Sequence, residues 1–237
     1  MNDLQAVLVL ADISGYTRFM LGSRKSRHHA TANIKHLLDT LAGEMREPLR
    51  VAEVEGDALF CVATREPVAG GWGDMRDIVI HLTRHLFDRF VVARDTLIVN
   101  NPCDCNACQN LGKLEVKLIV HWGEVTRGQI AGFITYSGVD VVVVHRLLKN
   151  RVKGRCYALF TRQAFDFLDL GGQFEVSDLN ETDEDLGVIP VVVHFPGGAP
   201  PRPRLSPVKR MAQAFWLMWR SLLLYLGQGK VYSPDAD

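Results

Sequence analysis

The sequence lacks an excess of charge of either sign. Lys and Arg together number 27, as do Asp and Glu, and the formal net charge is +0. A strongly basic chain is typical of proteins that bind nucleic acid, and this balance gives no such bias, so no nucleic-acid partner is expected. The apolar share of 47% and the charged share of 23% are those of an ordinary globular protein.

Two other features bear on the cell compartment. The N-terminus, MNDLQ, carries no basic run ahead of its short apolar stretch, so no signal peptide is expected. The five cysteines are an odd number, and three of them crowd into CDCNAC. Together these features favour a reducing, cytoplasmic compartment over a framework of disulfides. The 237 residues suffice for one large domain or for a domain with an appendage.

Hydrophobic patterning predicts alternating strands and helices. The segment 138–150 has both four valines, which suit a strand, and helical spacing. The order of the other elements is β-α-β-β-α-β, which indicates an α+β sandwich. The expected strands are 5–13, a hairpin over 49–64, a strand and hairpin over 113–133, and late strands near 154–160 and 188–195, with helices over 26–47 and 73–98.

The first strand ends on a carboxylate, in VLVLADISGYT, where a helix is expected to begin beside a glycine. An isolated buried charge is costly and needs a partner such as a cation or a metal. A helix N-terminus is a ready site for phosphate. Because a carboxylate would repel a phosphate unless a metal lay between them, Asp12 indicates a site for both a metal and a phosphate.

The stretch LADISGYTRFM, followed by Asp57 in EVEGDALF, resembles the class III nucleotide (adenylate/guanylate) cyclase homology domain. The resemblance extends over roughly residues 5–195 and is to a divergent bacterial branch. It implies a ferredoxin-like sandwich, in which helices cover a mainly antiparallel central sheet. It also implies a nucleotidyl cyclase, which converts a nucleoside triphosphate to a 3′,5′-cyclic nucleotide and pyrophosphate with two Mg²⁺ or Mn²⁺ ions.

The resemblance assigns roles to particular residues. Asp12, Asp57 and the backbone carbonyl of Ile13 would hold the two ions, and hard cations do prefer oxygen ligands. The triphosphate would bind at the start of the helix, where the chain reads Ser14, Gly15, Tyr16 and Thr17.

The base-binding positions of the family fall on Glu53 and Thr135. A carboxylate at Glu53 can accept hydrogen bonds from guanine, whereas Thr135 is a residue type that many bacterial adenylate cyclases use there. An exposed strand residue is the alternative for Glu53. The base therefore stays open, and a pyrimidine is among the candidates.

The third family motif, Gly-x-x-x-Asn-x-x-x-Arg, is incomplete. Gly138 and Arg146 keep the spacing, and Arg146 would meet charge on the phosphates, but Val142 replaces the Asn that orients the ribose. Loss of one such contact typically costs 10²–10³ in rate. The sequence thus fits either a slow cyclase or a non-catalytic, nucleotide-binding scaffold homodimer.

Two further expectations follow from the family pattern. No Lys lies between Lys153 and Lys209, so the late phosphate-binding Lys of the family has no direct counterpart. Metals and the Arg group come from different protomers in the family, which implies a head-to-tail homodimer here. Candidates to replace the missing Lys are Arg151, Lys153, Arg155 and Arg162.

The cluster CDCNAC carries Cys103, Cys105 and Cys108 within six residues. Thiolates this close suit Zn²⁺, which takes four ligands. The fourth ligand would be Cys156, His121 or a residue of a partner chain. A loop of free, redox-responsive thiols explains the same pattern equally well.

The composition predicts three parts: a cyclase homology domain over 1–196, a Pro-rich linker over 197–208, and an amphipathic helix and tail over 209–237. The helix is too short for a membrane span and has Arg220 at its middle. Its apolar face and preceding basic residues suit the surface of an anionic membrane, which would make the protein peripheral at the inner membrane. Docking on its own domain or on the dimer mate is the alternative.

Overall fold

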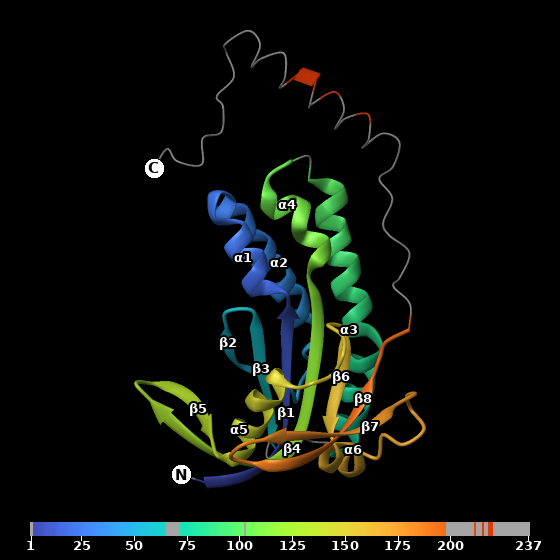
Figure 1. Ribbon diagram of the computed structural model, residues 1–237. Helices are drawn as coiled ribbons and strands as arrows, with labels where there is room; N and C mark the ends of the chain where they lie inside the picture. Colours follow the sequence, from blue (N-terminus) through green and yellow to red (C-terminus); the bar gives the residue numbers. More distant parts are fainter. Residues whose placement is uncertain are drawn as a thin grey trace.

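An eight-stranded sheet organises the computed structural model, which describes residues 2–64, 72–101, 103–197, and 211, 215, 218 and 219 (Figure 1). Its strands lie in the order β2-β3-β1-β4-β6-β8-β7, and β5 extends β4 outside this path. Among the described strands, β4 and β6 form the one parallel pair. The strands are β1 (Asn2–Ser14), β2 (Arg50–Glu55), β3 (Ala58–Thr64), β4 (Glu115–Ile130), β5 (Phe133–Ser137), β6 (Tyr157–Thr161), β7 (Ser177–Asp183) and β8 (Gly187–His194).

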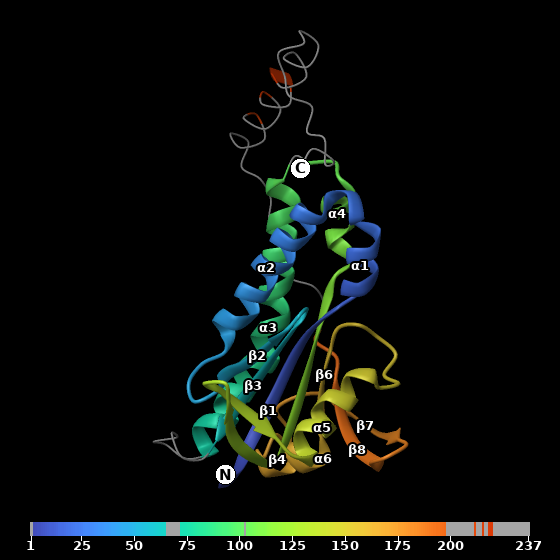
Figure 2. The same cartoon turned by 90° about the vertical axis from the view of Figure 1, so that its left-hand side faces the viewer.

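Helices cover both faces of this sheet, as Figure 2 shows from the side. On one face α2 and α3 form the larger core, and on the other α5 closes a smaller one. Short 3₁₀ turns follow α1, α4 and α5. The helices are α1 (Tyr16–Gly22), α2 (Arg27–Glu44), α3 (Trp72–Asn100), α4 (Asn106–Asn110), α5 (Val139–Arg146) and α6 (Arg162–Phe167).

Strand β1 runs through the centre of the sheet and is buried on both faces. Val7 and Val9 point into the α2–α3 core, while Leu8 and Leu10 point into the α5 core. Since side chains alternate along a strand, Asp12 lies on the same face as Leu8 and Leu10. The strand pattern therefore brings a carboxylate to the α5 face, at the end of the sheet.

The predicted α+β sandwich with a mainly antiparallel sheet is confirmed, and the segment 138–150 contains the helix α5. Strand β7 was not predicted, because its sequence SDLNETD is polar and Glu181 is its one buried residue. Helix α1 begins beside Gly15, as expected, whereas α4 and α6 were not predicted, because five or six residues are too few for a clear helical period.

The expected linker over 197–208 and the tail over 209–237 lie almost wholly outside the described residues. Met211, Phe215, Met218 and Trp219 are helical and exposed, and the rings of Phe215 and Trp219 stack. Within the described ranges, no helix has the length and apolar character needed to cross a membrane.

Candidate functional site

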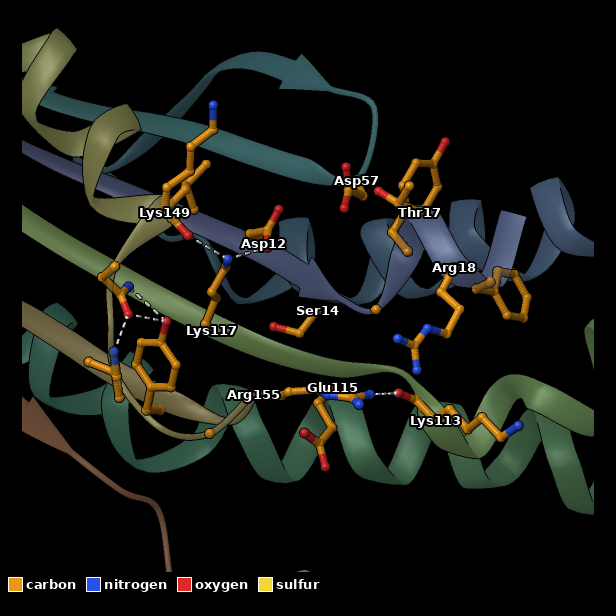
Figure 3. Close-up of a pocket in the computed structure, with 18 of the residues that line it drawn as sticks. Asp12, Ser14, Thr17, Arg18, Asp57, Lys113, Glu115, Lys117, Lys149 and Arg155 are labelled. Carbon is orange, nitrogen blue, oxygen red and sulfur yellow. Dashed lines mark hydrogen bonds and ion pairs between the residues drawn. The ribbon is translucent and has the colours of Figure 1, made fainter. Parts of the chain in front are cut away.

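A cavity of about 1110 Å³ opens where β1 ends and β4 begins (Figure 3). The turn between β2 and β3 and the segment after α5 form further walls. Three carboxylates line it, together with five cationic residues. The carboxylates are Asp12, Asp57 and Glu115, and the cationic residues are Arg18, Lys113, Lys117, Lys149 and Arg155.

Asp12 lies directly opposite Lys117 on the neighbouring strand β4. The Lys117 ammonium is 3.1 Å from Asp12 Oδ2 and also donates to the Leu148 carbonyl at 2.9 Å. Both side chains are mostly buried, at 14% and 16% exposed. The buried carboxylate that the sequence singled out therefore has a cationic partner supplied by the chain.

Asp57 comes from the β2–β3 turn and faces the same cavity. Its backbone carbonyl accepts a hydrogen bond from the Ile13 amide at 3.0 Å, which fixes the turn against the end of β1. Burial, and then the charge of Asp12, raise the pKa of Asp57 to about 6. The two carboxylates thus interact electrostatically, and a cation between them would relieve the cost.

The segment from Ser14 to Thr17 forms one wall of the cavity. Gly15 adopts a φ of 93°, and a Cβ atom there would come within 3.2 Å of the Lys113 carbonyl. A side chain at this position would be strained by both effects. Gly15 therefore lets the chain turn sharply from β1 into α1 beside the cavity.

Arg155 is the one of the four candidates to replace the family's late Lys that lines this cavity. It donates to the Lys113 carbonyl at 3.5 Å. Arg162 is instead paired with Asp166 and Asp178 at the far end of the sheet. Within the described residues, neither Arg151 nor Lys153 reaches the cavity lining.

Three other predicted residues stand apart from the cavity of their own chain. Glu53 is exposed on β2, and Thr135 lies half-buried on β5. Arg146 is 48% exposed, and its guanidinium is 3.0 Å from Asp185 and 3.7 Å from Asp183. Val142 is also exposed, at 47%. The structure therefore does not bring the base and Arg positions together with the two carboxylates within one chain.

The three cysteines of CDCNAC do come together, and the structure adds His29 from α2 to them. Burial tends to raise the pKa of Cys105, but hydrogen bonds with Cys108, His29 and Cys103 outweigh it and lower that pKa to about 6. The fourth partner differs from those expected: Cys156 lines another pocket, and His121 bonds Thr161 and Asp140.

Sequence reasoning missed Lys117 and His29. A signal for Lys117 was present, since it interrupts an apolar strand in which a charged residue needs a partner. No comparable signal existed for His29. It precedes Cys105 by 76 positions, and only the packing of α2 against α4 brings the two side chains together.

A family model described as "Protein of unknown function (DUF2652)" matches residues 34–157. The chain belongs to the DUF2652 family. This DUF2652 chain is 30% identical over 139 residues to "Uncharacterized protein Rv2561/Rv2562" of Mycobacterium tuberculosis (strain ATCC 25618 / H37Rv). The match covers 59% of the chain and 62% of that relative.

The DUF2652 chain has the fold of class III nucleotide cyclase domains. It is similar to the guanylyl cyclase Cya2 (TM-score 0.59, 16% identity), with 86% of this chain and 98% of that one covered. It is also similar to the guanylate cyclase domain of RhGC from Catenaria anguillulae in complex with GTP (TM-score 0.56, 18% identity), with 83% of this chain and 99% of that one covered. A third similar structure is the adenylyl cyclase CyaB from P. aeruginosa (TM-score 0.55, 10% identity), with 86% of this chain and 98% of that one covered. At these identities the likeness establishes the fold.

Proposed function

We propose that the protein is a divergent nucleotidyl cyclase, which converts a nucleoside triphosphate to a 3′,5′-cyclic nucleotide and pyrophosphate. In this reaction the ribose 3′-oxygen bonds to the α-phosphorus, and the bond from that phosphorus to the departing pyrophosphate breaks. One observation carries the proposal: a single cavity joins Asp12 and Asp57 to five cationic residues. The likeness to solved cyclases, one of them in complex with GTP, supports it.

The donor set of the cavity fits divalent metal ions. Asp12 and Asp57 are carboxylates that line the same cavity, and the raised pKa of Asp57 reflects a carboxylate that lacks full compensation for burial and for its neighbour's charge. Such oxygen donors suit Mg²⁺ or Mn²⁺. With the carbonyl of Ile13 they would hold two ions, which when bound would activate the 3′-oxygen and neutralise the phosphates.

The chain's own residues would bind and orient the triphosphate. The wall from Ser14 to Thr17 offers backbone close to the cavity, because Gly15 carries no side chain. Lys117 and Arg155 also line the cavity and provide positive charge. Arg155 would take the place of the late Lys that the family pattern leads one to expect.

The remaining contacts would come from a second copy of the chain in a head-to-tail homodimer. Arg146, Val142, Glu53 and Thr135 lie outside the cavity of their own chain, which supports this arrangement. Arg146 would then meet the phosphates bound by the partner.

A non-catalytic, nucleotide-binding scaffold is the second candidate. Val142 favours it, since a valine at the ribose-orienting position cannot form a hydrogen bond. Arg146 also favours it, because its guanidinium is already paired with Asp183 and Asp185. Both candidates require the same cavity, so the difference between them is turnover.

Incubation of the protein with Mn²⁺ and each of ATP, GTP, CTP and UTP tests the proposal, with cyclic products identified by mass spectrometry. We expect one triphosphate to give a cyclic product, and Asp57→Asn to abolish it. Val142→Asn, at an exposed position, should raise turnover by about 10–100-fold, because it adds a contact that typically contributes 10²–10³.

Nucleotide binding without product, in both the natural chain and the Val142→Asn variant, would establish the scaffold function instead. The same comparison identifies the base. If Glu53 reads guanine, GTP is preferred and Glu53→Lys weakens that preference. If Thr135 determines the choice of base instead, ATP is preferred, and Glu53→Lys leaves the preference for ATP over GTP in place.

A further inference from the structure

Four metal-ligating side chains converge where the start of α2 meets α4. They are His29 near the start of α2, Cys103 and Cys105 in the segment after α3, and Cys108 on α4. Their ligand atoms all lie within 4.8 Å of one another. Cys108 is buried, and the other three side chains are half-buried. Two chain segments that are distant in sequence, the start of α2 and the stretch 103–108, thus present one imidazole and three thiols to a common point.

The separations match a tetrahedral zinc centre. Cys105 Sγ is 3.5 Å from Cys108 Sγ, and His29 Nδ1 is 3.4 Å from Cys105 Sγ and 3.7 Å from Cys108 Sγ. Bonds of about 2.3 Å to sulfur and 2.0 Å to nitrogen, at tetrahedral angles, place two sulfurs about 3.8 Å apart and a sulfur and nitrogen about 3.5 Å apart. A disulfide would need the two sulfur atoms about 2.05 Å apart, and the cysteines are free.

A neighbouring side chain supports the cysteines in the way outer-shell groups support metal ligands. Asn101 Nδ2 donates to Cys108 Sγ at 3.0 Å, and Asn101 Oδ1 accepts from the Cys103 amide at 3.0 Å. One amide group therefore orients two of the three cysteine positions. Hydrogen bonds to ligating sulfur are a common feature of such sites.

We propose that His29, Cys103, Cys105 and Cys108 form a Cys₃His zinc site. Three thiolates and one imidazole are a closed set of four, the arrangement of structural zinc sites. Binding replaces the thiol protons, which are released to solvent. The soft ligands select zinc here, whereas the oxygen ligands of the cavity select Mg²⁺ or Mn²⁺, so the two metal sites do not compete.

The zinc site stabilises one wall of the cavity. Asn106 Nδ2 donates to the Gly22 carbonyl at 2.6 Å, and the Ala107 amide donates to Ser26 Oγ at 3.3 Å. These bonds join α4 to the last residue of α1 and to the 3₁₀ turn that follows it. Gly22 and Asn110 themselves line the cavity. Metal binding therefore holds α4 against the end of α1 at this wall of the cavity.

Metal analysis of the full chain tests the site. The protein is purified without a polyhistidine tag, under reducing conditions, and zinc and iron are counted by inductively coupled plasma mass spectrometry. We expect about one zinc per chain. His29→Asn and Cys105→Ser should weaken zinc binding by more than the roughly 10–100-fold that loss of an outer-shell partner costs.

Two matched controls lie in the same chain. His28→Asn changes the exposed neighbour of His29, and Cys156→Ser removes a thiol outside the cluster; both should keep the zinc. In case a ligand variant does not fold, Co²⁺ is exchanged into the natural chain. Tetrahedral thiolate-bound cobalt has strong ligand-field and charge-transfer bands, whose appearance supports the site.

Three results would overturn the zinc site: a metal-free protein, iron with sulfide in place of zinc, or full zinc affinity in His29→Asn. A metal-free protein whose Cys105 and Cys108 form a disulfide after the reductant is removed would establish the redox alternative. Nucleotide is left out of every step, so the result is independent of cyclase activity.

Discussion

At the scale of single residues, Asp12 and Asp57 are two carboxylates of one cavity with different electrostatic surroundings. Asp12 has Lys117 at 3.1 Å as its counter-charge. Asp57 is half-buried, and burial and then Asp12 raise its pKa to about 6. The ionised form of Asp12 is therefore stabilised in the folded state. The ionised form of Asp57 is disfavoured there, which lowers the stability of the fold.

This difference predicts opposite effects of two matching substitutions on the free energy of unfolding. At pH 7 in a chelator, Asp12→Asn should destabilise by about 1–3 kcal/mol, because it leaves the buried Lys117 ammonium without its charged partner. Asp57→Asn should stabilise, because it removes a carboxylate whose ionised form is disfavoured. Urea unfolding followed by circular dichroism measures both. Equal losses in the two variants would contradict this account of the cavity.

The sequence was informative for these residues because each is part of a short local motif. Asp12 follows a strand and precedes a glycine, and Asp57 follows a tight turn, so both could be identified without knowledge of packing. Lys117 and Arg155 belong to no such motif. Their place in the cavity depends on strand register and on the course of the chain after α5, which long-range contacts determine.

At the scale of secondary-structure elements, His121 joins three of them. It lies buried on β4, with Nδ1 2.9 Å from Thr161 Oγ1 at the end of β6 and Nε2 2.8 Å from Asp140 Oδ1 on α5. Burial lowers its pKa from the usual 6.5, and the hydrogen bond and charge of Asp140 only partly oppose this. The ring is thus kept neutral in the folded state at pH values where a free histidine is charged.

This shift predicts a pH dependence of stability. Below pH 6.5 the unfolded chain protonates His121 while the folded chain does not, so the unfolded state binds more protons and stability falls as the pH falls. The contribution is at most about 1.4 kcal/mol per pH unit. Thermal or urea unfolding from pH 7.5 to 5 should show a shallower decline for His121→Gln. Parallel curves for the two proteins would exclude His121 as the titrating group.

Helices and strands could be predicted from the sequence where buried apolar residues recur at a clear helical or strand spacing. The long helices α2 and α3 and the core strands β1, β3 and β4 follow the sequence pattern. The polar edge strand β7 and the short helices α4 and α6 do not, because their conformation depends on neighbours rather than on their own hydrophobic pattern. The missed α4 carries Cys108, so the sequence could identify the cysteines as a group but not the histidine that completes it.

At the scale of the whole molecule, one chain divides its predicted functional residues between two surfaces. Asp12, Asp57 and Arg155 line one cavity, whereas Arg146 lies elsewhere. A head-to-tail dimer would bring the two surfaces together twice, once at each of two equivalent sites. The sequence could suggest this division only through its resemblance to cyclases, since spacing along the chain says nothing about which copy supplies a residue.

Mixing of variants tests the shared sites. When Asp57→Ala and Arg146→Ala chains are unfolded and refolded together, half of the dimers are mixed, and each mixed dimer keeps one intact site. Activity should therefore return to about a quarter of the natural level, although each variant alone is inactive. Asp57→Ala mixed with Arg155→Ala is the matched control. Both residues line the same cavity of one chain, so every site in that mixture is damaged and activity should stay low. Recovery in both mixtures, or in neither, would contradict a site that two chains share.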